Sequence, residues 1–567
     1  MDTINPQRTF AYQPCAEQRS QPVGGAARAV RPVAVVGAGP VGLAAAIDLA
    51  QRGVPVVVLD DDDTLATGSR AICFAKRTLD ILDRLGCGDR VAAKGVSWHV
   101  GKVFFGDEQV YRFDLLPEAG HRRPAFVNLQ QYYLEGFLIE RAAELPGIEL
   151  RWRHRVTGVA PGHDEVALTV STPDGDYALH ARYVVAADGA HSAVRQSLGL
   201  ESKGRVFRDR FLIADVKMAA PFPAERWFWF DPPFNRHRSA LLHRQPDDVW
   251  RLDFQLGWDA DPDAEKQPER VIPRIRAMLG GEVAFTLEWV SVYTFCCQRM
   301  DAFRHGRVLF AGDAAHRVSP FGARGANSGV QDAENLAWKL ALVLAGRAGD
   351  ALLDSYASER EAAADENIRH STRSTDFITP KSAVSRTFRD AVLRLARRHA
   401  FARQLVNSGR LSLPTVLADS PLNMPDHDVF AGAMVPGAPC VDAPLQRQGD
   451  ARPGWLLGEV GDGFTLLVFG GGSAIPADAR RRLATGAVPL RLLCVVPPGQ
   501  TAAMPDGLRY LTDAEGLAAH RYDGRPGTCY LIRPDQHVCA RWRAFDAEAV
   551  HAALLRALCL PHDGQMH

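Results

Sequence analysis

Three glycines near the N-terminus are the first residues of this sequence whose spacing could do chemistry. Gly37, Gly39 and Gly42 form the pattern Gly-x-Gly-x-x-Gly between an apolar run and an alanine-rich segment. In such a turn the first glycine allows a tight bend, the second lets the backbone approach a pyrophosphate, and the third lets a helix pack closely on a strand. The helix N-terminus then offers N–H groups to the phosphates. The motif therefore predicts a dinucleotide-binding site.

An acid follows this motif at a suitable distance. Asp60 ends the apolar run at residues 56–59, where its carboxylate can accept a hydrogen bond from a ribose hydroxyl. Residues 31–60 are predicted to form a strand, a helix and a second strand, which requires a parallel sheet. A glycine-rich turn without a ligand is the alternative, and it leaves the position of the acid unexplained.

Two later segments also place acids at the ends of apolar runs. Residues 184–187 lead into Asp-Gly, and residues 308–311 lead into Gly-Asp, which is followed by a glycine-rich loop. An acid at a strand end can bind a polyol, and a helix N-terminus after the loop can stabilise partial negative charge. The candidate cofactor-binding residues in these segments are Asp188, Gly312, Asp313, Pro320, Gly325, Ala326 and Asn327.

These segments resemble the three FAD fingerprints of the aromatic-hydroxylase flavoproteins, which include phenol hydroxylase, para-hydroxybenzoate hydroxylase and 3-(3-hydroxyphenyl)propionate hydroxylase. The resemblance covers about residues 31–375 and implies non-covalently bound FAD. It places Asp60 at the adenosine ribose and Asp313 at the ribityl chain. Arg70 and Gln131 match the flavin-contacting Arg and Gln of the family. The backbone of residues 325–327 would then face the pyrimidine ring of the flavin.

The resemblance also implies a reaction, namely hydroxylation of a phenolic or related aromatic substrate with NAD(P)H and O2 through a flavin C4a-hydroperoxide. No second Gly-x-Gly-x-x-Gly is present, so NAD(P)H is expected to visit as a transient co-substrate. Two features depart from the phenol hydroxylase branch. Ala-Arg-Gly-Ala-Asn at residues 323–327 replaces its Gly-Gln-Gly-Met-Asn, and no carboxylate follows Arg70, where that branch has a base for the phenol proton.

The expected fold is α/β: a Rossmann-like FAD domain with an inserted antiparallel substrate-binding sheet, and a C-terminal thioredoxin-like α/β domain. The tail resembles the phenol branch through Tyr-Leu-Ile-Arg-Pro-Asp at residues 530–535, and it contains no Cys-x-x-Cys. The predicted boundaries are a disordered tail at 1–30, the first part of the FAD domain at 31–206, the substrate sheet at 207–294, the second part of the FAD domain with further helices at 295–410, a linker at 411–436, and the thioredoxin-like domain at 437–567.

The inserted sheet carries the candidate catalytic residues. His243 and Tyr293 are the candidates for contacting the substrate, although a His or Tyr in such a sheet more often has a structural role. Arg244 and Arg251 could hold a carboxylate, but a solvated arginine is the more common case. Side chains alternate between the two faces of a strand, and the sequence alone does not fix which set faces the flavin.

Composition narrows the function classes. Lys and Arg together number 66, as do Asp and Glu, so the formal net charge of zero argues against nucleic-acid binding. The ten cysteines have no metal-ligand or disulfide spacing, which predicts reduced thiols, no metal site and a cytoplasmic location. No apolar stretch is long enough to span a membrane. The resemblance to the phenol branch further implies a homodimer.

Three other functions stay open. Trp-Phe-Trp-Phe-Asp-Pro at residues 227–232 is similar to a halogenase signature, for which Lys76 would have to be the lysine near the flavin. The chain could also be an FAD-dependent dehydrogenase or oxidase of a similar aromatic substrate. A flavin-bound module that senses or carries a ligand without turnover is the third.

Overall fold

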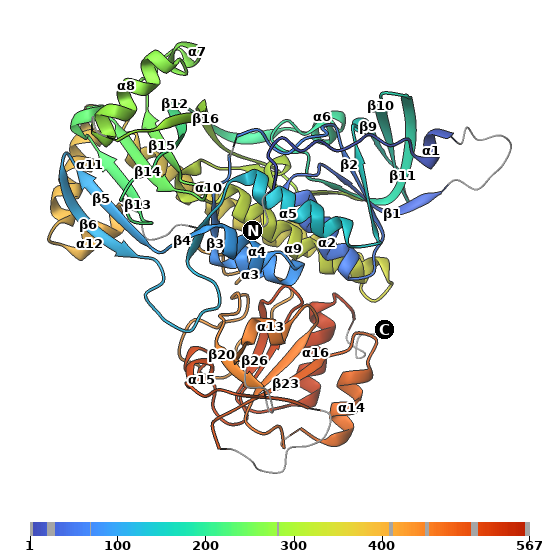
Figure 1. The fold of residues 1–567 in the computed structure, drawn as a ribbon. Coiled ribbons are helices and arrows are strands. Elements are labelled where there is room, and N and C mark those ends of the chain that lie inside the picture. The colour runs from blue at the N-terminus through green and yellow to red at the C-terminus, as the bar shows by residue number, and fades with distance from the viewer. Residues whose placement is uncertain are drawn as a thin grey trace.

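The computed structural model describes residues 4–19, 29–68, 70–280, 283–406, 412–447, 453–473, 475–499 and 508–561. It contains an FAD-type α/β domain, a large substrate sheet beside it and a C-terminal α/β domain (Figure 1). The C-terminal domain, orange to red in Figure 1, lies against the side of the FAD-type domain that carries helices α3 (Lys76–Leu85), α4 (Gly88–Lys94) and α9 (Gly325–Leu344).

A parallel sheet forms the centre of the first domain. Its strand order is β17-β18-β11-β1-β2-β8, in which β17 pairs antiparallel with β18 and the other neighbours pair in parallel. The central strands β1, β2 and β18 are mostly buried because helices cover them, as apolar runs of valine and leucine require. The strands are β1 (Val30–Val36), β2 (Val56–Asp60), β8 (Ile148–Trp152), β11 (Gly175–Ala186), β17 (Arg304–His305) and β18 (Val308–Phe310), with β9 (Arg155–Pro161) and β10 (Val166–Thr172) as an antiparallel extension.

Helices and a small sheet complete this domain. The three-stranded sheet has the order β3-β7-β4, and it joins the segment after Arg70 to the rest of the domain. The remaining elements are α2 (Pro40–Gln51), β3 (Cys73–Ala75), β4 (Val96–Trp98), β7 (Phe126–Asn128), α5 (Gln131–Ala143), α6 (Ala193–Ser197), the 3-10 turns η2 (Gly312–Ala314) and η3 (Pro320–Gly322), and α10 (Leu352–Ile378). The predicted Rossmann-like arrangement is confirmed.

The substrate sheet has eight strands in the order β19-β16-β12-β15-β14-β13-β5-β6. The antiparallel strands expected between residues 207 and 294 are present. They are β12 (Ser202–Lys217), β13 (Arg226–Phe230), β14 (Ser239–Arg244), β15 (Val249–Gln255) and β16 (Thr286–Met300), with η1 (Pro233–Asn235), α7 (Pro262–Glu265) and α8 (Pro268–Leu279) between them, and β19 (His316–Arg317) at one edge.

The expected limits of this sheet, residues 207–294, are too narrow. β5 (Val100–Phe105) and β6 (Glu108–Asp114) belong to it, and β5 pairs in parallel with β13. These two strands come from the first part of the FAD domain, so a contiguous insertion could not supply them. The missed signal is the aromatic and β-branched run at residues 100–105.

The predicted disordered tail at 1–30 is wrong for the part that the structure describes. Helix α1 (Ala16–Arg19) and residues 4–15 pack on the first domain. Ile4 is buried against Gly136, and Phe10 stacks on Trp152 with ring centroids 4.4 Å apart. A few large apolar side chains therefore hold this polar segment in place, while residues 1–3 and 20–28 lie outside the described part of the chain.

The C-terminal domain is built on a mixed seven-stranded sheet with the order β21-β20-β24-β23-β22-β25-β26, which confirms the expected α/β domain. Within residues 412–436, which precede it, the structure has no helix or strand. The elements are β20 (Pro444–Arg447), β21 (Pro453–Trp455), α13 (Leu456–Val460), β22 (Thr465–Phe469), α14 (Ala477–Thr485), β23 (Arg491–Val496), β24 (Arg509–Thr512), α15 (Leu517–Arg521), β25 (Cys529–Ile532), β26 (Val538–Trp542) and α16 (Ala547–Ala557).

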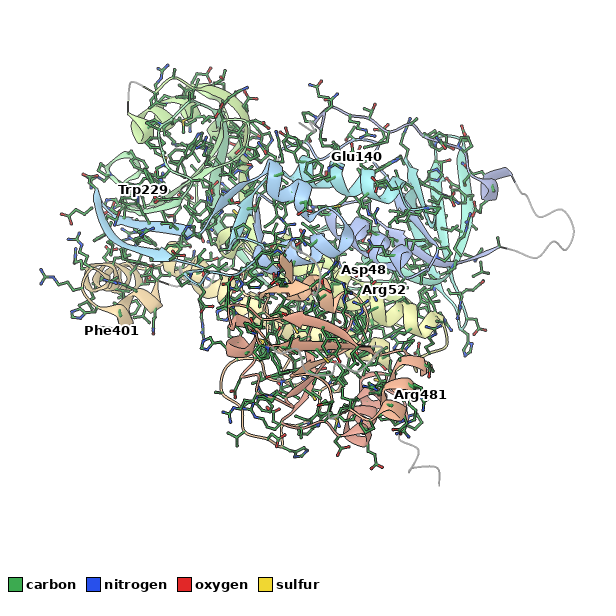
Figure 2. The ribbon with its side chains drawn as sticks, turned by 60° about the horizontal axis from the view of Figure 1, so that its bottom comes forward. Asp48, Arg52, Glu140, Trp229, Phe401 and Arg481 are labelled. Atoms are coloured by element: carbon green, nitrogen blue, oxygen red, sulfur yellow. The ribbon has the colours of Figure 1, made fainter. Side chains whose placement is uncertain are left out.

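The two domains share buried contacts. At the exposed edge of the contact, Arg52, the C-cap residue of α2, donates a hydrogen bond to the carbonyl oxygen of Asp462 at 2.9 Å, and Figure 2 shows Arg52 and Asp48 beside the C-terminal domain. Trp338 of α9 and Leu352 of α10 belong to the same apolar core as β22 and α16. None of the described helices is long and apolar enough to cross a membrane.

Candidate active site

The glycine-rich turn between β1 and α2 has the geometry of a phosphate-binding loop. Gly37 has a φ of 102°, and a Cβ there would lie 2.5 Å from the carbonyl oxygen of Ala187. A Cβ on Gly42 would lie 1.9 Å from the carbonyl oxygen of Gly37. A Cβ on Gly39 would meet no protein atom within 4 Å, so the backbone at this glycine faces open space. These are the separate roles that the motif predicts for its three glycines.

Two helix N-termini near this turn have no side-chain cap. Gly39 is the N-cap of α2 and Arg324 is the N-cap of α9. The first N–H groups of a helix otherwise need a partner, and a phosphate or a partly anionic ring can provide one. Asp60 lies beside the first of these N-termini, where its carboxylate accepts hydrogen bonds from the backbone N–H of Ala38 at 2.5 Å and of Asp62 at 2.9 Å.

The Asp-Gly segment at residues 188–189 and the Gly-Asp segment at residues 312–313 pack close to this turn through their backbones. A Cβ on Gly329 of α9 would lie 2.6 Å from Val41 and 3.1 Å from the Cα of Gly312, so α2, η2 and α9 approach at these glycines. Arg195 joins the other two segments by donating to the carbonyl oxygens of Ala190 and Ala314, both at 2.7 Å. The predicted cofactor residues Asp188, Gly312 and Asp313 therefore lie around one site.

The residues expected to contact the flavin occupy the adjoining loops. Gln131 accepts a hydrogen bond from the backbone N–H of Ala71 at 3.1 Å, which fixes the segment after Arg70. Arg70 is exposed. Pro320 starts η3, and half-buried Gly325 and Ala326 start α9. A polyol-binding acid, an arginine and two helix N-termini without side-chain caps fit the phosphates, ribityl chain and ring of FAD.

Asn327 has a structural role that the sequence did not reveal. Its side-chain oxygen accepts from the backbone N–H of Ala75 at 2.8 Å, and its amide nitrogen donates to the carbonyl oxygens of Cys73 at 2.8 Å and Ala323 at 2.5 Å. The buried amide thus joins β3 to the start of α9. Its backbone, rather than its side chain, is left to face a flavin.

Asp332 is a supporting residue that sequence reasoning missed. Its carboxylate accepts from the backbone N–H of Gly312 at 3.0 Å, from Arg360 Nε at 2.6 Å and from His316 Nε2 at 2.7 Å. Burial alone would raise the pKa of Asp332, but the charges of His316 and Arg360 lower it below its usual value. His316 is therefore buried beneath the Gly-Asp turn. Its position on α9, two turns after Gly325, could have indicated that the side chain of Asp332 lies near the Gly-Asp turn.

Strand register decides which face of the substrate sheet points toward the FAD loops. Phe321 of η3 packs against Phe211 and Phe295, with ring centroids 4.8 and 5.1 Å away, so the face that bears these two residues is the inner one. Pairing places Tyr293 opposite Phe211 and His243 opposite Arg251 on this inner face. The opposite face is apolar and packs on α8.

Both candidate catalytic residues therefore point to the inner face. Tyr293 is half-buried; desolvation raises its pKa, and the charges of Arg251 and Arg70 lower it in part. His243 is 3% exposed, and burial together with the charges of Arg226 and Arg251 holds its pKa well below 6.5. His243 is consequently a neutral imidazole at physiological pH.

The prediction that Arg251 is solvated is wrong. Arg251 is 3% exposed and forms a two-point ion pair with Asp215, with Nε–Oδ1 and Nη2–Oδ2 distances of 2.8 Å. Asp215 stands directly opposite it on β12. The sequence alone does not indicate this ion pair, because the two residues are far apart in the chain and only the pairing of β12 with β15 brings them together.

The tryptophans of the halogenase-like segment at residues 227–232 lie on the outer face of the substrate sheet, away from the FAD loops. Trp227 and Trp229 pack in the outer, apolar layer, and Figure 2 labels Trp229 on this sheet. Lys76 forms an ion pair with Asp80 at 2.9 Å, one turn along α3. Neither the tryptophans nor the lysine therefore points to the inner face.

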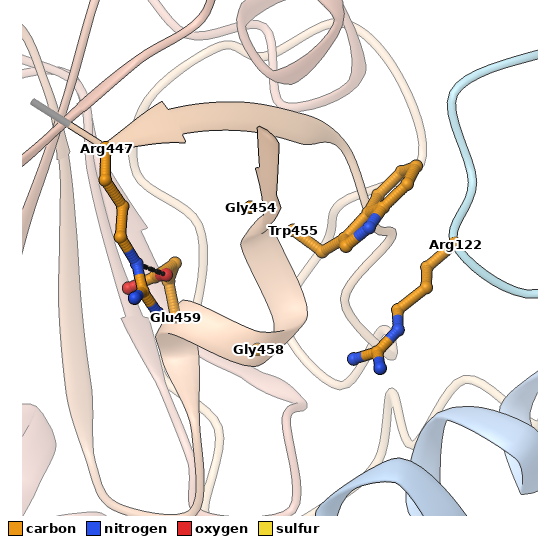
Figure 3. A pocket seen from close by; sticks show the side chains of 6 residues that line it. All are labelled: Arg122, Arg447, Gly454, Trp455, Gly458 and Glu459. Atoms are coloured by element: carbon orange, nitrogen blue, oxygen red, sulfur yellow. Dashed lines mark hydrogen bonds and ion pairs between the residues drawn. The ribbon is translucent and has the colours of Figure 1, made fainter. Parts of the chain in front are cut away.

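A hollow elsewhere on the molecule is not part of this site. Figure 3 shows it between Arg122 and the C-terminal domain, and its volume is about 350 Å³. It is lined by Arg122, Arg447, Gly454, Trp455, Gly458 and Glu459, and Arg447 is paired with Glu459. None of the FAD fingerprints contributes to it.

Comparison with known proteins agrees with this geometry. Residues 31–371 match the model of the family described as FAD binding domain, and residues 451–557 match the HcaD C-terminal domain. The chain is 31% identical over 565 residues to 6-methylpretetramide 4-monooxygenase of Streptomyces rimosus, with 94% of each chain covered. The chain belongs to the FAD-binding monooxygenase family. Its FAD-dependent aromatic hydroxylase activity follows from this membership.

A second curated relative and two solved structures match this monooxygenase as well. It is 36% identical to the probable NADH-specific resorcinol 4-hydroxylase of Rhodococcus jostii, over 60% of this chain and 64% of that one. Two solved structures also match. They are the flavin-dependent monooxygenase PieE in complex with FAD and substrate (TM-score 0.79, 25% identity, 94% and 100% coverage) and aklavinone-11 hydroxylase with FAD and aklavinone (TM-score 0.74, 25% identity, 93% and 99% coverage).

The role of Asp313 can be tested directly. Asp313→Ala should weaken FAD binding by roughly ten- to a hundred-fold, because a charge-assisted hydrogen bond to a ribityl hydroxyl contributes about 1.5–3 kcal/mol. Titration of the apoprotein with FAD, followed by quenching of flavin fluorescence, measures the change. An unchanged dissociation constant would place the ribityl chain elsewhere.

Proposed function

We propose that this monooxygenase hydroxylates a phenolic or related aromatic substrate, with NAD(P)H and O2, between the Arg70 loop and the inner face of the substrate sheet. The observation that carries the proposal is the packing of Phe321 on Phe211 and Phe295, because it brings that face against the loop before α9. Trp289, on the same face, packs directly over Gly68. Both contacts join the sheet to loops that would hold FAD.

FAD supplies the redox chemistry when bound, since it accepts hydride from NAD(P)H and delivers one oxygen atom of O2 to the substrate. The N-terminus of α9 would stabilise negative charge on the pyrimidine side of the ring through the N–H groups of residues 325–327. Tyr293 and His243 would contact the substrate from the sheet. Ile72, Trp98 and Phe126 pack together beside β3 with Ala323, and this apolar cluster would help to exclude water.

A substrate screen tests the proposed function. Phenols, aromatic acids and polycyclic phenols are mixed with FAD-loaded protein, and NAD(P)H oxidation is followed with and without each compound. At least one phenol should stimulate oxidation and yield a product that contains one atom of oxygen-18 from ¹⁸O2. Stimulation without incorporated label would instead indicate a dehydrogenase or oxidase. No stimulation by any aromatic compound would contradict the proposal.

We also propose that the enzyme is a homodimer. Helices α11 (Ala383–Ala396) and α12 (Ala400–Leu405) expose large apolar side chains, including Val384, Phe388 and Phe401, which are 79%, 59% and 60% exposed. Exposed apolar patches are common at protein–protein contacts. Light scattering should give twice the 62.0 kDa chain mass, and Phe388→Glu should shift the species toward monomer. A monomer at micromolar concentration would contradict this.

A cytoplasmic location completes the proposal. All ten cysteines are free thiols, and eight of them are buried. Buried free thiols suit a reducing compartment, where disulfides do not form. Cell fractionation with an antibody to the chain would test the assignment.

A further inference from the structure

Several polar atoms on the inner face of the substrate sheet are buried without a hydrogen-bond partner among the described residues. They are Arg226 Nη1, His243 Nδ1, Gln245 Oε1 and Asp253 Oδ1. The residues stand on or next to three adjacent strands, β13, β14 and β15. Buried polar groups in proteins are almost always hydrogen-bonded, so a cluster of unsatisfied ones on one face points to a ligand.

Two charges in this cluster are left over after the local ion pairs are formed. Arg251 is satisfied by Asp215, whereas the guanidinium of Arg226, a residue that is 7% exposed, makes no hydrogen bond or ion pair with any described residue. Asp253 lies with its Oδ2 3.8 Å from His243 Nε2, and that imidazole is neutral. The charges of Arg226 and Asp253 act on each other, but no hydrogen bond joins them, and each keeps a buried polar atom without a partner, which is unfavourable unless a ligand binds there.

The charges also indicate the chemical class of the ligand group. Two arginines and two ionised aspartates, 226, 251, 215 and 253, sum to zero. A carboxylate would satisfy Arg226 but would face the anion of Asp253. A phenolic hydroxyl satisfies both residues, because it donates to a carboxylate and accepts from a guanidinium. The cluster therefore favours a hydroxyl group over an anion.

The cluster lies near the loop that would hold the flavin. Arg226, Arg251 and Asp253 are close enough to Cys73 of β3 for their charges to act on its thiol, whose pKa burial raises to about 11. The carbonyl oxygen of Cys73 accepts a hydrogen bond from Asn327 at the start of α9. A ring whose hydroxyl is bound at Asp253 would thus lie beside the same loops.

We propose that Asp253 accepts the proton of the phenolic hydroxyl of the substrate and that Arg226 holds the resulting oxygen anion. The phenol O–H bond breaks, a carboxyl O–H bond forms on Asp253, and the electron pair stays on the phenolate oxygen. A phenolate ring is richer in electrons than a phenol ring and is attacked more readily by an electrophilic oxygen. The inference rests on the proposed function, and it supplies the base that is missing after Arg70.

The titration of Asp253 gives the expected pH dependence. Burial raises the pKa of Asp253 to about 6, while the charges of Arg251 and Arg226 lower it in part and Asp215 raises it. The facing groups are Arg226 on β13, His243 on β14, Arg251 on β15, Asp215 on β12 and Cys73 on β3. Asp253 accepts a proton only when it is ionised. Turnover should therefore rise with pH, reach half of its maximum near pH 6 and level off at higher pH.

The test uses 4-nitrophenol, because its phenolate absorbs visible light and its phenol form does not. Difference spectra of the FAD-loaded protein are recorded with the probe below the pKa of the free nitrophenol. The wild type should bind the probe as the phenolate, and Asp253→Asn should bind it as the neutral phenol. Arg226→Met should bind it weakly and without ionisation. A wild-type probe that stays protonated, or no binding at millimolar probe, would overturn the proposal.

Kinetics provide the second measurement. Asp253→Asn should lower kcat for a phenol that the wild type hydroxylates by about a hundred-fold or more, the usual contribution of a general base, with a smaller change in KM. The matched control is Asp248→Asn, an exposed aspartate in the turn of the same hairpin, which should behave as the wild type. Its φ of 57° is one that asparagine tolerates.

These outcomes separate the inference from the proposed function. Normal FAD content in Asp253→Asn shows that the variant is folded. If the wild type hydroxylates phenols and Asp253→Asn does so equally fast, the role of Asp253 is wrong and the hydroxylase stands. If the wild type binds nitrophenol as the phenolate but hydroxylates no phenol, the result supports the phenol-binding role of Asp253 and Arg226 and contradicts the proposed hydroxylation.

Discussion

Replacing Gly39 with alanine should stabilise the apoprotein and at the same time weaken its affinity for FAD by more than a hundred-fold. Gly39 has an ordinary φ of −71°, and a Cβ there would meet no protein atom within 4 Å. Such a substitution stabilises a protein by about 0.4–1 kcal/mol, because it restricts the unfolded chain. The same methyl group would occupy the space where the pyrophosphate meets the backbone. Losing one or two charge-assisted hydrogen bonds costs about 3 kcal/mol.

Two further variants separate the effect on FAD binding from a general effect on stability. Gly42→Ala should lose both stability and FAD, because its Cβ would lie 1.9 Å from the carbonyl oxygen of Gly37. Gly458→Ala, whose Cβ also meets nothing but lies in the C-terminal domain, should leave FAD affinity unchanged. Urea denaturation of the apoproteins and FAD titration give the two quantities. Wild-type affinity in Gly39→Ala would show that the pyrophosphate binds elsewhere.

The FAD-type domain was predictable because its signals are local. Gly37 and Gly42 are fixed by contacts within the β1–turn–α2 unit or with the end of β11, and Asp60 reaches the same turn through its hydrogen bond to Ala38. Each fingerprint is a strand end followed by a helix start. Periodicity and turn chemistry over some thirty residues therefore suffice to recognise it.

The inner face of the substrate sheet was not predictable, because its chemistry depends on pairing between distant strands. Arg251 was expected to be solvated, and its partner Asp215 is on another strand. A shift of one residue in register would have exchanged the inner and outer faces. For the same reason β5 was assigned to the FAD domain, although its partner is β13.

The buried parts of the N-terminal segment escaped prediction for a related reason. Composition makes residues 1–30 polar overall, yet Ile4 and Phe10 find apolar surfaces formed by α5 and β8. Composition averages over a segment, whereas two well-placed large side chains can hold it. Only the three-dimensional surface shows where such side chains fit.

The motif at residues 530–535 was identified by resemblance alone, and the structure supplies its physical reason. Arg533 is 0% exposed, and its guanidinium binds Asp535 of its own domain and Glu359 of α10, with an Nη1–Oε1 distance of 2.6 Å to Glu359. Glu359 also accepts hydrogen bonds from Lys339 and Asn335 of α9, both at 2.7 Å. The motif thus joins the C-terminal domain to the helix whose N-terminus lies at the flavin loop.

Replacing Arg533 with methionine should therefore lower the free energy of unfolding by about 3–5 kcal/mol, the usual effect of removing one partner from a buried ion pair. Glu359 would keep its ion pair with Lys339, and Asp535 would keep only the contact with His537 at 3.4 Å among the ion pairs that the described residues give it. Urea denaturation followed by circular dichroism measures the change. The control is Arg482→Met, which breaks an exposed ion pair with Asp478 and should cost less than about 0.5 kcal/mol.

The same network predicts how the domains respond to acid. Burial would raise the pKa values of Glu359 and Asp535, but the charge of Arg533 outweighs it and holds both far below their usual values. Their contribution to stability is therefore complete above pH 4.5 and is lost as the pH falls toward their folded values. In Arg533→Met these folded pKa values rise toward their unfolded values, so the variant should lose less of its remaining stability than the wild type does as the pH falls below 4.5. Wild-type acid sensitivity in the variant, together with a loss of stability below about 1 kcal/mol, would mean that water already screens this network.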